Sequence, residues 1–251
     1  MRSPYAPRRE PCSLRGVHEV YAPYAVVDAA RLPSCSSAQG TRYDGFREAL
    51  LPGRQQLLRH ALPWHEAPRT WLSVGCGTAR DLEYVLGHVQ ACETTLWLID
   101  LSADLLAIAR RRVERLGIAS SVHIIVGDIT DPAARERLPK PGTFDMVTCS
   151  YCLTMIPNWR HALATMVEYV RPAGGQIALV DFTCRSDMPR HWSQRLNRWW
   201  FAHDGVFLNA EHTAALRALP GVQTVWLHES EHRVPYTPLY ATSYIYVGRA
   251  S

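Results

Sequence analysis

The sequence predicts an α/β fold in which helices cover both faces of a doubly wound, mostly parallel sheet. Two observations carry this prediction. Between Thr70 and Asp181, short continuous apolar runs alternate with amphipathic helical segments, a pattern typical of parallel strands that are buried on both faces. A glycine-containing turn at 75–77 separates the first apolar run from the first helical segment. Right-handed crossover connections then distribute the helices over the two faces of the sheet.

Each element follows from its apolar spacing and from the turn residues beside it. Strands are expected over Trp71–Val74, Thr95–Ile99, Val122–Val126, Phe144–Thr148 and Gln176–Val180. Helices are expected over Gln55–Leu62, just after Pro52, and over Asp81–Val89, Ala103–Leu116 and Trp159–Val170. The alternation loosens after Asp181, where we expect a helix over Met188–His203 and an antiparallel edge pair of strands over Val222–Leu227 and Thr242–Val247.

The composition is that of an ordinary globular protein of 251 residues, 47% hydrophobic and 20% charged. No stretch approaches the roughly 20 apolar residues of a bilayer-spanning helix. The net charge is +4, and the sequence lacks the clustered Lys and Arg residues of nucleic-acid binders. Seven cysteines without a disulfide pattern, and a start rich in Pro and Arg, indicate a cytoplasmic protein. We expect an irregular or helical cap over 1–42 and one domain over 43–251, with a substrate-side insertion near 186–215.

The strongest functional signal is the segment Val74–Thr78, which lies between the first strand and the first helix. Gly75 and Gly77 allow the backbone to turn tightly and to approach a ligand without an intervening Cβ atom. Asp100 closes the second strand, where a carboxylate can accept hydrogen bonds from ribose hydroxyls. Alternatively, Asp100 could cap the helix that begins near Ala103.

Two further strand ends point to the same edge of the sheet. Asp128 closes the third strand, where its side chain can bind an adenine amino group while Ile129 packs on the ring. Ser150 and Tyr151 close the fourth strand, beside the point at which the strand order reverses. Together with the glycine turn, these residues predict a nucleoside-binding site.

Arg80 indicates which kind of nucleoside ligand is expected. Dinucleotide-binding turns carry a third glycine that lets the helix N-terminus reach a pyrophosphate. Arg80 stands at that position, and its side chain would crowd a pyrophosphate, which disfavours an NAD-dependent oxidoreductase. A ligand with ribose and adenine but no phosphate fits better, and S-adenosylmethionine is such a ligand.

Residues 43–182 resemble a class I S-adenosylmethionine-dependent methyltransferase, which implies a seven-stranded Rossmann-like methyltransferase sheet. The resemblance lies in Val74–Thr78, Ile99–Ser102, Gly127–Ile129, Phe144–Val147 and Arg171–Gly175. It implies a set of cofactor-binding residues: Arg54, Gly75, Cys76, Gly77, Asp81, Asp100, Leu101, Asp128, Ile129 and Ser150. Many members carry an acid two residues before the first glycine. This chain has Ser73 there, and Asp81 is expected to compensate.

A narrower resemblance covers about 43–247. Its segments are similar to the methyltransferase component of betaine-lipid synthases: Tyr43–Asp44, Leu51–Arg54, Ser150–Pro157, Val180–Phe182 and Trp199–Val206. This implies that the amino group of a diacylglyceryl-homoserine lipid is methylated three times. Two alternatives stay open: a methyltransferase of a small soluble metabolite at nitrogen, sulfur or oxygen, and a non-catalytic cofactor-binding regulator.

Methyl transfer is an in-line displacement, so the protein must align the acceptor and exclude water. Tyr43 and Tyr151, which we expect at the mouth of the pocket, are candidates to accept the proton that the acceptor amine loses. Aromatic faces would hold a trimethylated nitrogen through cation–π attraction; the candidates are Trp199, Trp200, Tyr236 and Tyr240. Arg47 and Arg190 could bind a substrate carboxylate or anionic headgroup. Alternatively, these aromatic residues could belong to the core, and the arginines could lie on a solvent-exposed helix face. The expected partner is a small-molecule or lipid-headgroup acceptor, with at most peripheral membrane contact.

One motif resembles a zinc site and another resembles a redox-active cysteine pair, and we predict neither function for them. His228–His232 matches H-E-x-x-H, but zinc binding needs both histidines on one helix face, and the preceding residues read as a strand. Cys149 and Cys152 form a C-x-x-C without a second pair, at the end of the fourth strand. We therefore expect no metal and two free thiols.

Overall fold

The structure of the chain, a computed structural model, describes residues 51–62, 68–184, 208–234 and 240–251. The expected N-terminal cap, the expected helix over Met188–His203 and most of the insertion near 186–215 lie outside these residues. So do several expected site residues: Tyr43, Arg47, Arg190, Trp199, Trp200 and Tyr236.

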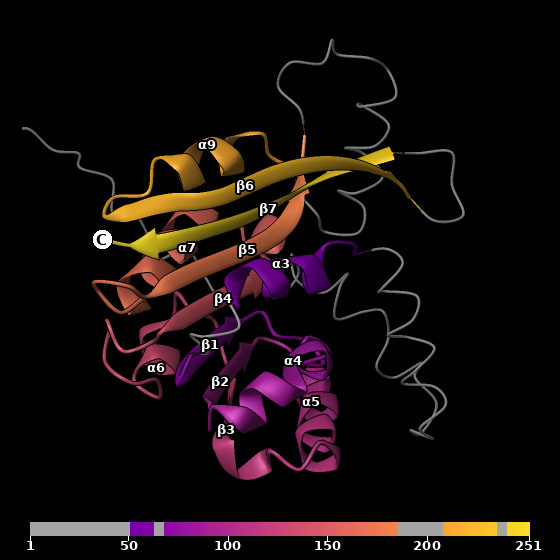
Figure 1. Cartoon of the computed structure of the whole chain (residues 1–251), viewed down its shortest axis with the longest axis vertical. Coiled ribbons are helices and arrows are strands. Elements are labelled where there is room, and N and C mark those ends of the chain that lie inside the picture. The colour runs from indigo at the N-terminus through magenta and orange to yellow at the C-terminus, as the bar shows by residue number, and fades with distance from the viewer. Residues whose placement is uncertain (1–50, 63–67, 185–207, 235–239) are drawn as a thin grey trace, which may run out of the picture.

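Seven strands form one sheet in the order β3-β2-β1-β4-β5-β7-β6 (Figure 1). Their bounds are β1 Thr70–Val74, β2 Thr95–Asp100, β3 Val122–Val126, β4 Met146–Ser150, β5 Gln176–Thr183, β6 Val222–Arg233 and β7 Tyr240–Ala250. The first five strands are parallel, whereas β7 runs antiparallel to both β5 and β6. The predicted doubly wound, mostly parallel sheet is therefore confirmed.

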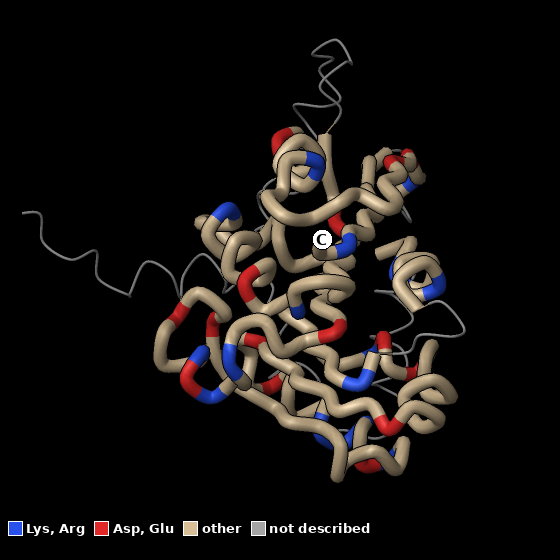
Figure 2. The backbone as a smooth tube through the Cα atoms, turned by 60° about the vertical axis from the view of Figure 1, so that its left-hand side comes forward, with Lys and Arg blue, Asp and Glu red and all other residues tan. Residues whose placement is uncertain are grey.

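Helices cover both faces of this sheet (Figure 1). Two buried clusters separate the faces. One cluster packs α3 (Arg54–Ala61), α4 (Leu82–Ala91) and α5 (Ala103–Arg115) against the sheet, and the other packs α6 (Pro132–Arg135), α7 (Trp159–Tyr169) and α9 (Glu211–Arg217). Lys and Arg are interspersed with Asp and Glu over the described chain, as Figure 2 shows.

The strand order reverses between β1 and β4. β1 pairs with β2 on one side and with β4 on the other, so the chain leaves β1 toward one edge and later returns to the other side. Inside the sheet, the indole Nε1 of Trp71 donates a buried hydrogen bond of 2.8 Å to Thr148 Oγ1 and joins β1 to β4. In open α/β sheets, ligands bind at the carboxyl ends of the strands at such a reversal.

The structure corrects some predicted boundaries. The fourth strand begins at Met146 rather than Phe144, because Phe144 pairs instead with the end of α7: its amide donates to Tyr169 O and its carbonyl accepts from Arg171 N. The two late strands extend well beyond the predicted segments, since β6 continues through polar residues as far as Arg233. β6 is the edge strand of the sheet, where alternate side chains face solvent and polar residues cost little.

Candidate cofactor and active site

The glycine turn follows β1 and is held against β2. The amides of Gly75 and Cys76 both donate to the carbonyl of Ile99, at 2.8 and 3.3 Å. Gly75 and Gly77 have φ angles of 63° and 54°, in the left-handed region that favours glycine. A Cβ on Gly75 would lie 2.2 Å from Cys152 Sγ. Position 75 therefore requires glycine for both its backbone conformation and its close packing.

Asp100 lies against this turn. Its Oδ2 accepts a 2.8 Å hydrogen bond from Gly77 N, and its Oδ1 accepts a 2.9 Å hydrogen bond from Ser102 N. Ser102, not Asp100, caps α5, because its hydroxyl accepts from Leu105 N. The alternative role of Asp100 as the cap is therefore wrong. Each carboxylate oxygen can accept more than one hydrogen bond, so Asp100 can also bind ribose hydroxyls beside the turn.

A hollow of about 400 Å³, open to solvent, lies at the reversal point. Its lining residues are Arg54, Ser73, Gly75, Cys76, Gly77, Thr78, Asp81 and Ser150. The structure thus brings together many of the expected cofactor residues, from α3, β1, the glycine turn and the end of β4.

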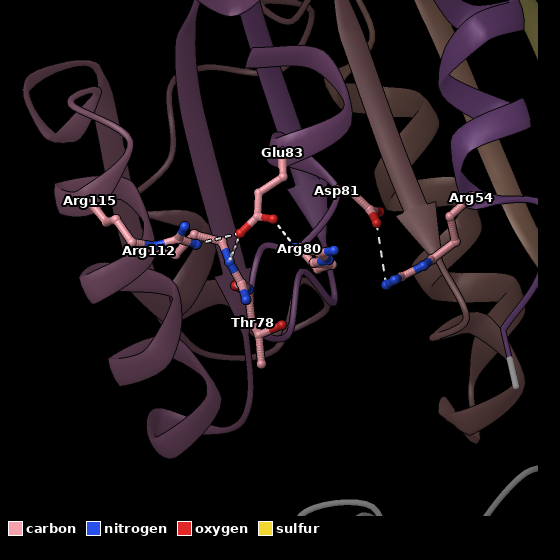
Figure 3. A network of polar contacts seen from close by, with 7 residues as sticks. All are labelled: Arg54, Thr78, Arg80, Asp81, Glu83, Arg112 and Arg115. Atoms are coloured by element: carbon pink, nitrogen blue, oxygen red, sulfur yellow. Dashed lines mark hydrogen bonds and ion pairs between the residues drawn. The ribbon is translucent and has the colours of Figure 1, made fainter. Parts of the chain in front are cut away.

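Charges of both signs line one side of the hollow. Arg54 Nη1 lies 3.3 Å from Asp81 Oδ1, and both side chains are mostly buried (Figure 3). Arg54 is the first residue of α3, whose Leu57, Leu58 and Ala61 are buried in the core and fix the helix in place. A carboxylate and a guanidinium side by side suit a zwitterionic amino-acid group.

Cys76 forms part of the floor of the hollow. Burial raises the pKa of its thiol well above the usual value, and the nearby Asp100 and Asp81 carboxylates raise it further. The thiol is therefore neutral at physiological pH and is a weak nucleophile, since the thiolate is the reactive form.

A partly buried ion cluster supports the glycine turn. Glu83, in the first turn of α4, contacts Arg80, Arg112 and Arg115, with Arg112 Nε at 2.8 Å and Arg115 Nη2 at 2.5 Å (Figure 3). Arg112 is 7% exposed and also donates from Nη1 to the carbonyl of Thr78, within the turn. The cluster therefore connects α5 and α4 directly to the loop that lines the hollow.

Sequence reasoning did not find Arg112, because it lies in the run Arg110–Arg112 of an ordinary amphipathic helix. A signal was present: Leu106, Ala109 and Val113 form the buried stripe of α5, and Arg112 falls within that stripe. An arginine on an apolar stripe indicates a buried cation with a specific partner.

The residues predicted to bind adenine do not all lie as expected. Asp128 Oδ1 accepts a 2.8 Å hydrogen bond from Thr130 N, next to the carboxyl end of β3. Ile129 is 2% exposed and packs with Leu138 in the core, so its expected packing on the ring is wrong for this structure. Leu101, directly after Asp100, is 40% exposed and offers apolar surface beside the turn.

Tyr151 does not lie at the mouth of the hollow as expected. It is 4% exposed, its ring packs 4.8 Å from that of Phe182, and its hydroxyl donates to the carbonyl of Pro52. Burial raises the pKa of this phenol. A buried, neutral phenol that already donates its proton is not a proton acceptor, so the catalytic assignment of Tyr151 is wrong. The expected substrate residue Tyr240 is exposed at the start of β7 and does not line the hollow.

His228–His232 lies inside β6, which continues past the predicted end at Leu227, so the segment lacks the helical geometry of a zinc site. Within the described ranges, no three His, Cys, Asp or Glu residues are grouped to hold a metal ion. None of the helices there combines the length and apolar character needed to cross a bilayer.

Fold and site together define an α/β protein with a nucleoside-type cofactor site at its strand-order reversal. The sequence pattern of the methyltransferase-domain family matches residues 43–218, and the chain belongs to this family. Its cofactor is S-adenosylmethionine, and the residues at the hollow are chemically suited to it: Asp100 carries acceptors for hydroxyl groups, Arg54 and Asp81 carry charges opposite to those of an amino-acid group, and Arg80 stands where dinucleotide sites need glycine.

Curated relatives match only part of their length. The chain is 32% identical over 108 residues to the demethylmenaquinone methyltransferase of Bacillus cytotoxicus, which is 43% of each protein. It is 31% identical over 103 residues to an uncharacterized protein of Synechococcus, covering 41% of this chain and 23% of that one. The matched segments thus span less than half the length of these relatives.

Solved structures share the fold. The YcgJ protein of Bacillus subtilis has a TM-score of 0.60 at 14% identity, covering 79% of this chain and 97% of that one. Geranyl diphosphate methyltransferase in complex with GPP and sinefungin has a TM-score of 0.57 at 17% identity, and the match covers 78% of this chain and 76% of that one. At these identities the likeness shows the fold alone.

Proposed function

We propose that the chain transfers the methyl group of S-adenosylmethionine to the amino nitrogen of an amino-acid-like moiety, ending in a trimethylammonium group of the betaine-lipid headgroup type. The observation that carries the methyl-transfer part is the hollow at the glycine turn with Asp100 beside it. The nitrogen acceptor is supported by the resemblance of Ser150–Pro157 and neighbouring segments to the betaine-lipid enzymes. The expected setting is the cytoplasm, with at most peripheral membrane contact.

The described residues would hold the cofactor by its two ends. Asp100 would bind the ribose hydroxyls, while Arg54 and Asp81 would bind the carboxylate and ammonium of the amino-acid end. Asp81 would thereby replace the acid that many family members carry at the position of Ser73. When bound, the cofactor supplies a methyl group on a positively charged sulfur.

The surrounding side chains would protect that methyl group from side reactions. Because the pKa of Cys76 is raised by burial and by neighbouring carboxylates, its thiol stays protonated and does not compete with the acceptor. With Tyr151 excluded as a base, Tyr43 remains the candidate proton acceptor; otherwise the acceptor amine would arrive neutral or release its proton to solvent.

A second candidate acceptor is a quinol carbon. It is favoured by the 32% identity to a demethylmenaquinone methyltransferase, although the match covers 43% of each protein. The hollow would bind the same cofactor in either case, so only the acceptor distinguishes the two candidates.

The test uses the purified full chain and S-adenosylmethionine with a labelled methyl group. One reaction receives diacylglyceryl-homoserine in detergent micelles, and another receives demethylmenaquinol. Label that tandem mass spectrometry places on the nitrogen of the homoserine headgroup supports the nitrogen acceptor, and a trimethylated headgroup identifies the proposed end product. Label confined to the quinol reaction would refute the nitrogen acceptor and support the carbon acceptor. Asp100→Ala serves as the control for label that does not depend on the site.

A further inference from the structure

A buried carboxylate anchors the connection that leaves β4. Asp181, near the end of β5, is 1% exposed. Its Oδ1 accepts hydrogen bonds from Thr154 Oγ1 at 2.6 Å and from Phe182 N at 2.7 Å, and its Oδ2 accepts from Thr154 N at 3.0 Å. Two of these three bonds come from one residue of the short turn η2 (Leu153–Met155). The donors are neutral, so hydrogen bonds rather than an ion pair hold the carboxylate.

The same connection forms part of the cofactor site. Ser150 lines the hollow at the end of β4, and Tyr151 then turns the chain with a φ of 52°. Cys152 follows, and its Sγ fills the space directly beside Gly75. Thr154 comes two residues later. The path from Asp181 through Thr154 to Cys152 therefore ends on the glycine turn.

We propose that Asp181 is a positioning residue for the cofactor site: by holding Thr154, it keeps Cys152 packed against Gly75 and keeps Ser150 in the wall of the hollow. It touches neither the cofactor nor the acceptor. The proposal uses the cofactor site but does not depend on the identity of the acceptor.

The position should respond to protonation, because burial raises the pKa of Asp181 to about 6 in spite of the hydrogen bonds it accepts. A protonated carboxyl loses one acceptor oxygen, so one bond to Thr154 weakens. Several titratable groups surround Asp181. They are Cys149, Tyr151 and Cys152 of β4 and its connection, and Tyr244 of β7. Farther away lies His212 of α9, whose ring centre is 6.2 Å from that of Tyr244.

Most of these neighbours keep one charge state where Asp181 titrates. Burial raises the pKa of Tyr151 and Tyr244, and a hydrogen bond with Cys149 together with burial raises that of Cys152. Burial lowers the pKa of His212 to about 4, so it is neutral above pH 5. A change in cofactor affinity centred near pH 6 that Asp181→Asn abolishes is therefore assignable to Asp181.

The experiment is calorimetric titration of the full chain with S-adenosylhomocysteine between pH 5.5 and 7.5. For the wild type we expect the dissociation constant to rise roughly fivefold at the low end, the effect of one weakened hydrogen bond. Asp181→Asn should bind roughly tenfold more weakly at pH 7.5 and show no change between the two pH values. Thr154→Val should also bind more weakly, whereas Thr154→Ser, which keeps the hydroxyl, should restore the wild-type constant.

Ile177→Ala is the matched structural control. Ile177 is buried in the same strand and on the same face, four residues before Asp181, but it belongs to no bond that holds the connection. If Ile177→Ala weakened binding as much as Asp181→Asn at equal stability, or if Asp181→Asn kept the wild-type constant and pH profile, the proposal would be refuted. Binding of S-adenosylhomocysteine without methylation of either acceptor would refute the proposed function and leave this inference intact.

Discussion

Asp100→Asn tests the cofactor site at the residue on which it most depends. In the wild type, the two carboxylate oxygens accept from Gly77 N and Ser102 N at 2.8 and 2.9 Å. An asparagine offers one oxygen and one NH₂ group, so one of these amides would face a donor. We expect cofactor binding to weaken by about 1.5–3 kcal/mol, as for the loss of a hydrogen bond to a charged group, which is roughly 10- to 150-fold in the dissociation constant. Calorimetric titration with S-adenosylhomocysteine measures this change in the dissociation constant.

Asp104→Asn provides the matched control for that measurement. Asp104 is also an acid, in the first turn of α5, but it is exposed and makes no contact with the glycine turn. It should bind S-adenosylhomocysteine as the wild type does. If Asp100→Asn keeps its fold by circular dichroism and binds within twofold of the wild type, the assignment of Asp100 to the cofactor is wrong.

Four further outcomes follow from the described contacts. Arg112→Met should lower the free energy of unfolding, measured by urea denaturation, by about 1.5–3 kcal/mol, because it removes the hydrogen bonds of a buried guanidinium to Glu83 and to the carbonyl of Thr78; Arg110→Met, at an exposed position of the same helix, should change it by less than about 0.5 kcal/mol. Gly75→Ala should abolish cofactor binding, and adding Cys152→Ala should recover part of it by relieving the 2.2 Å contact but not the positive φ. Tyr151→Phe should cost about 1 kcal/mol of stability yet keep methyl transfer within threefold; a hundredfold loss would contradict its exclusion as a base. In the folded state the pKa of Asp181 is raised from 3.8 to about 6. The protonated carboxyl therefore contributes on the order of 3 kcal/mol to the free energy of unfolding below pH 4, and this contribution is lost as the pH rises through 6. The urea-measured stabilities of wild type and Asp181→Asn should diverge over that range and run parallel above it.

The sequence predicts the central sheet well because its parallel strands are buried on both faces. Continuous apolar runs such as Leu96–Ile99 have no other common explanation between amphipathic helices. The full lengths of β6 and β7 were not predicted, since polar edge residues hide the alternation that marks a strand. Phe144 is as apolar as a strand residue, and only its pairing with the end of α7 removes it from β4.

The site was predicted where the backbone determines it and missed where side-chain direction does. Glycines at 75 and 77 and an acid at the end of β2 follow from spacing along the chain. The direction of the Tyr151 ring depends on a left-handed φ at a non-glycine residue, which no periodicity shows. The position of Ile129 directly after Asp128 predicts a contact with the ligand, but the sequence does not reveal that Ile129 is buried with Ala134 of α6 and Leu138.

Cofactor binding and acceptor choice are separable in this molecule. The glycine turn is fixed from three sides: by Ile99 O and Asp100 on β2, by Arg112 on α5, and by Cys152 after β4. Each of these supports belongs to the sheet, to its helices or to the connection that leaves β4. A preorganised site of this kind loses little entropy when the cofactor binds. It follows that S-adenosylhomocysteine should bind the same way whether the acceptor is an amine or a quinol, so the cofactor site can be tested before the acceptor is identified.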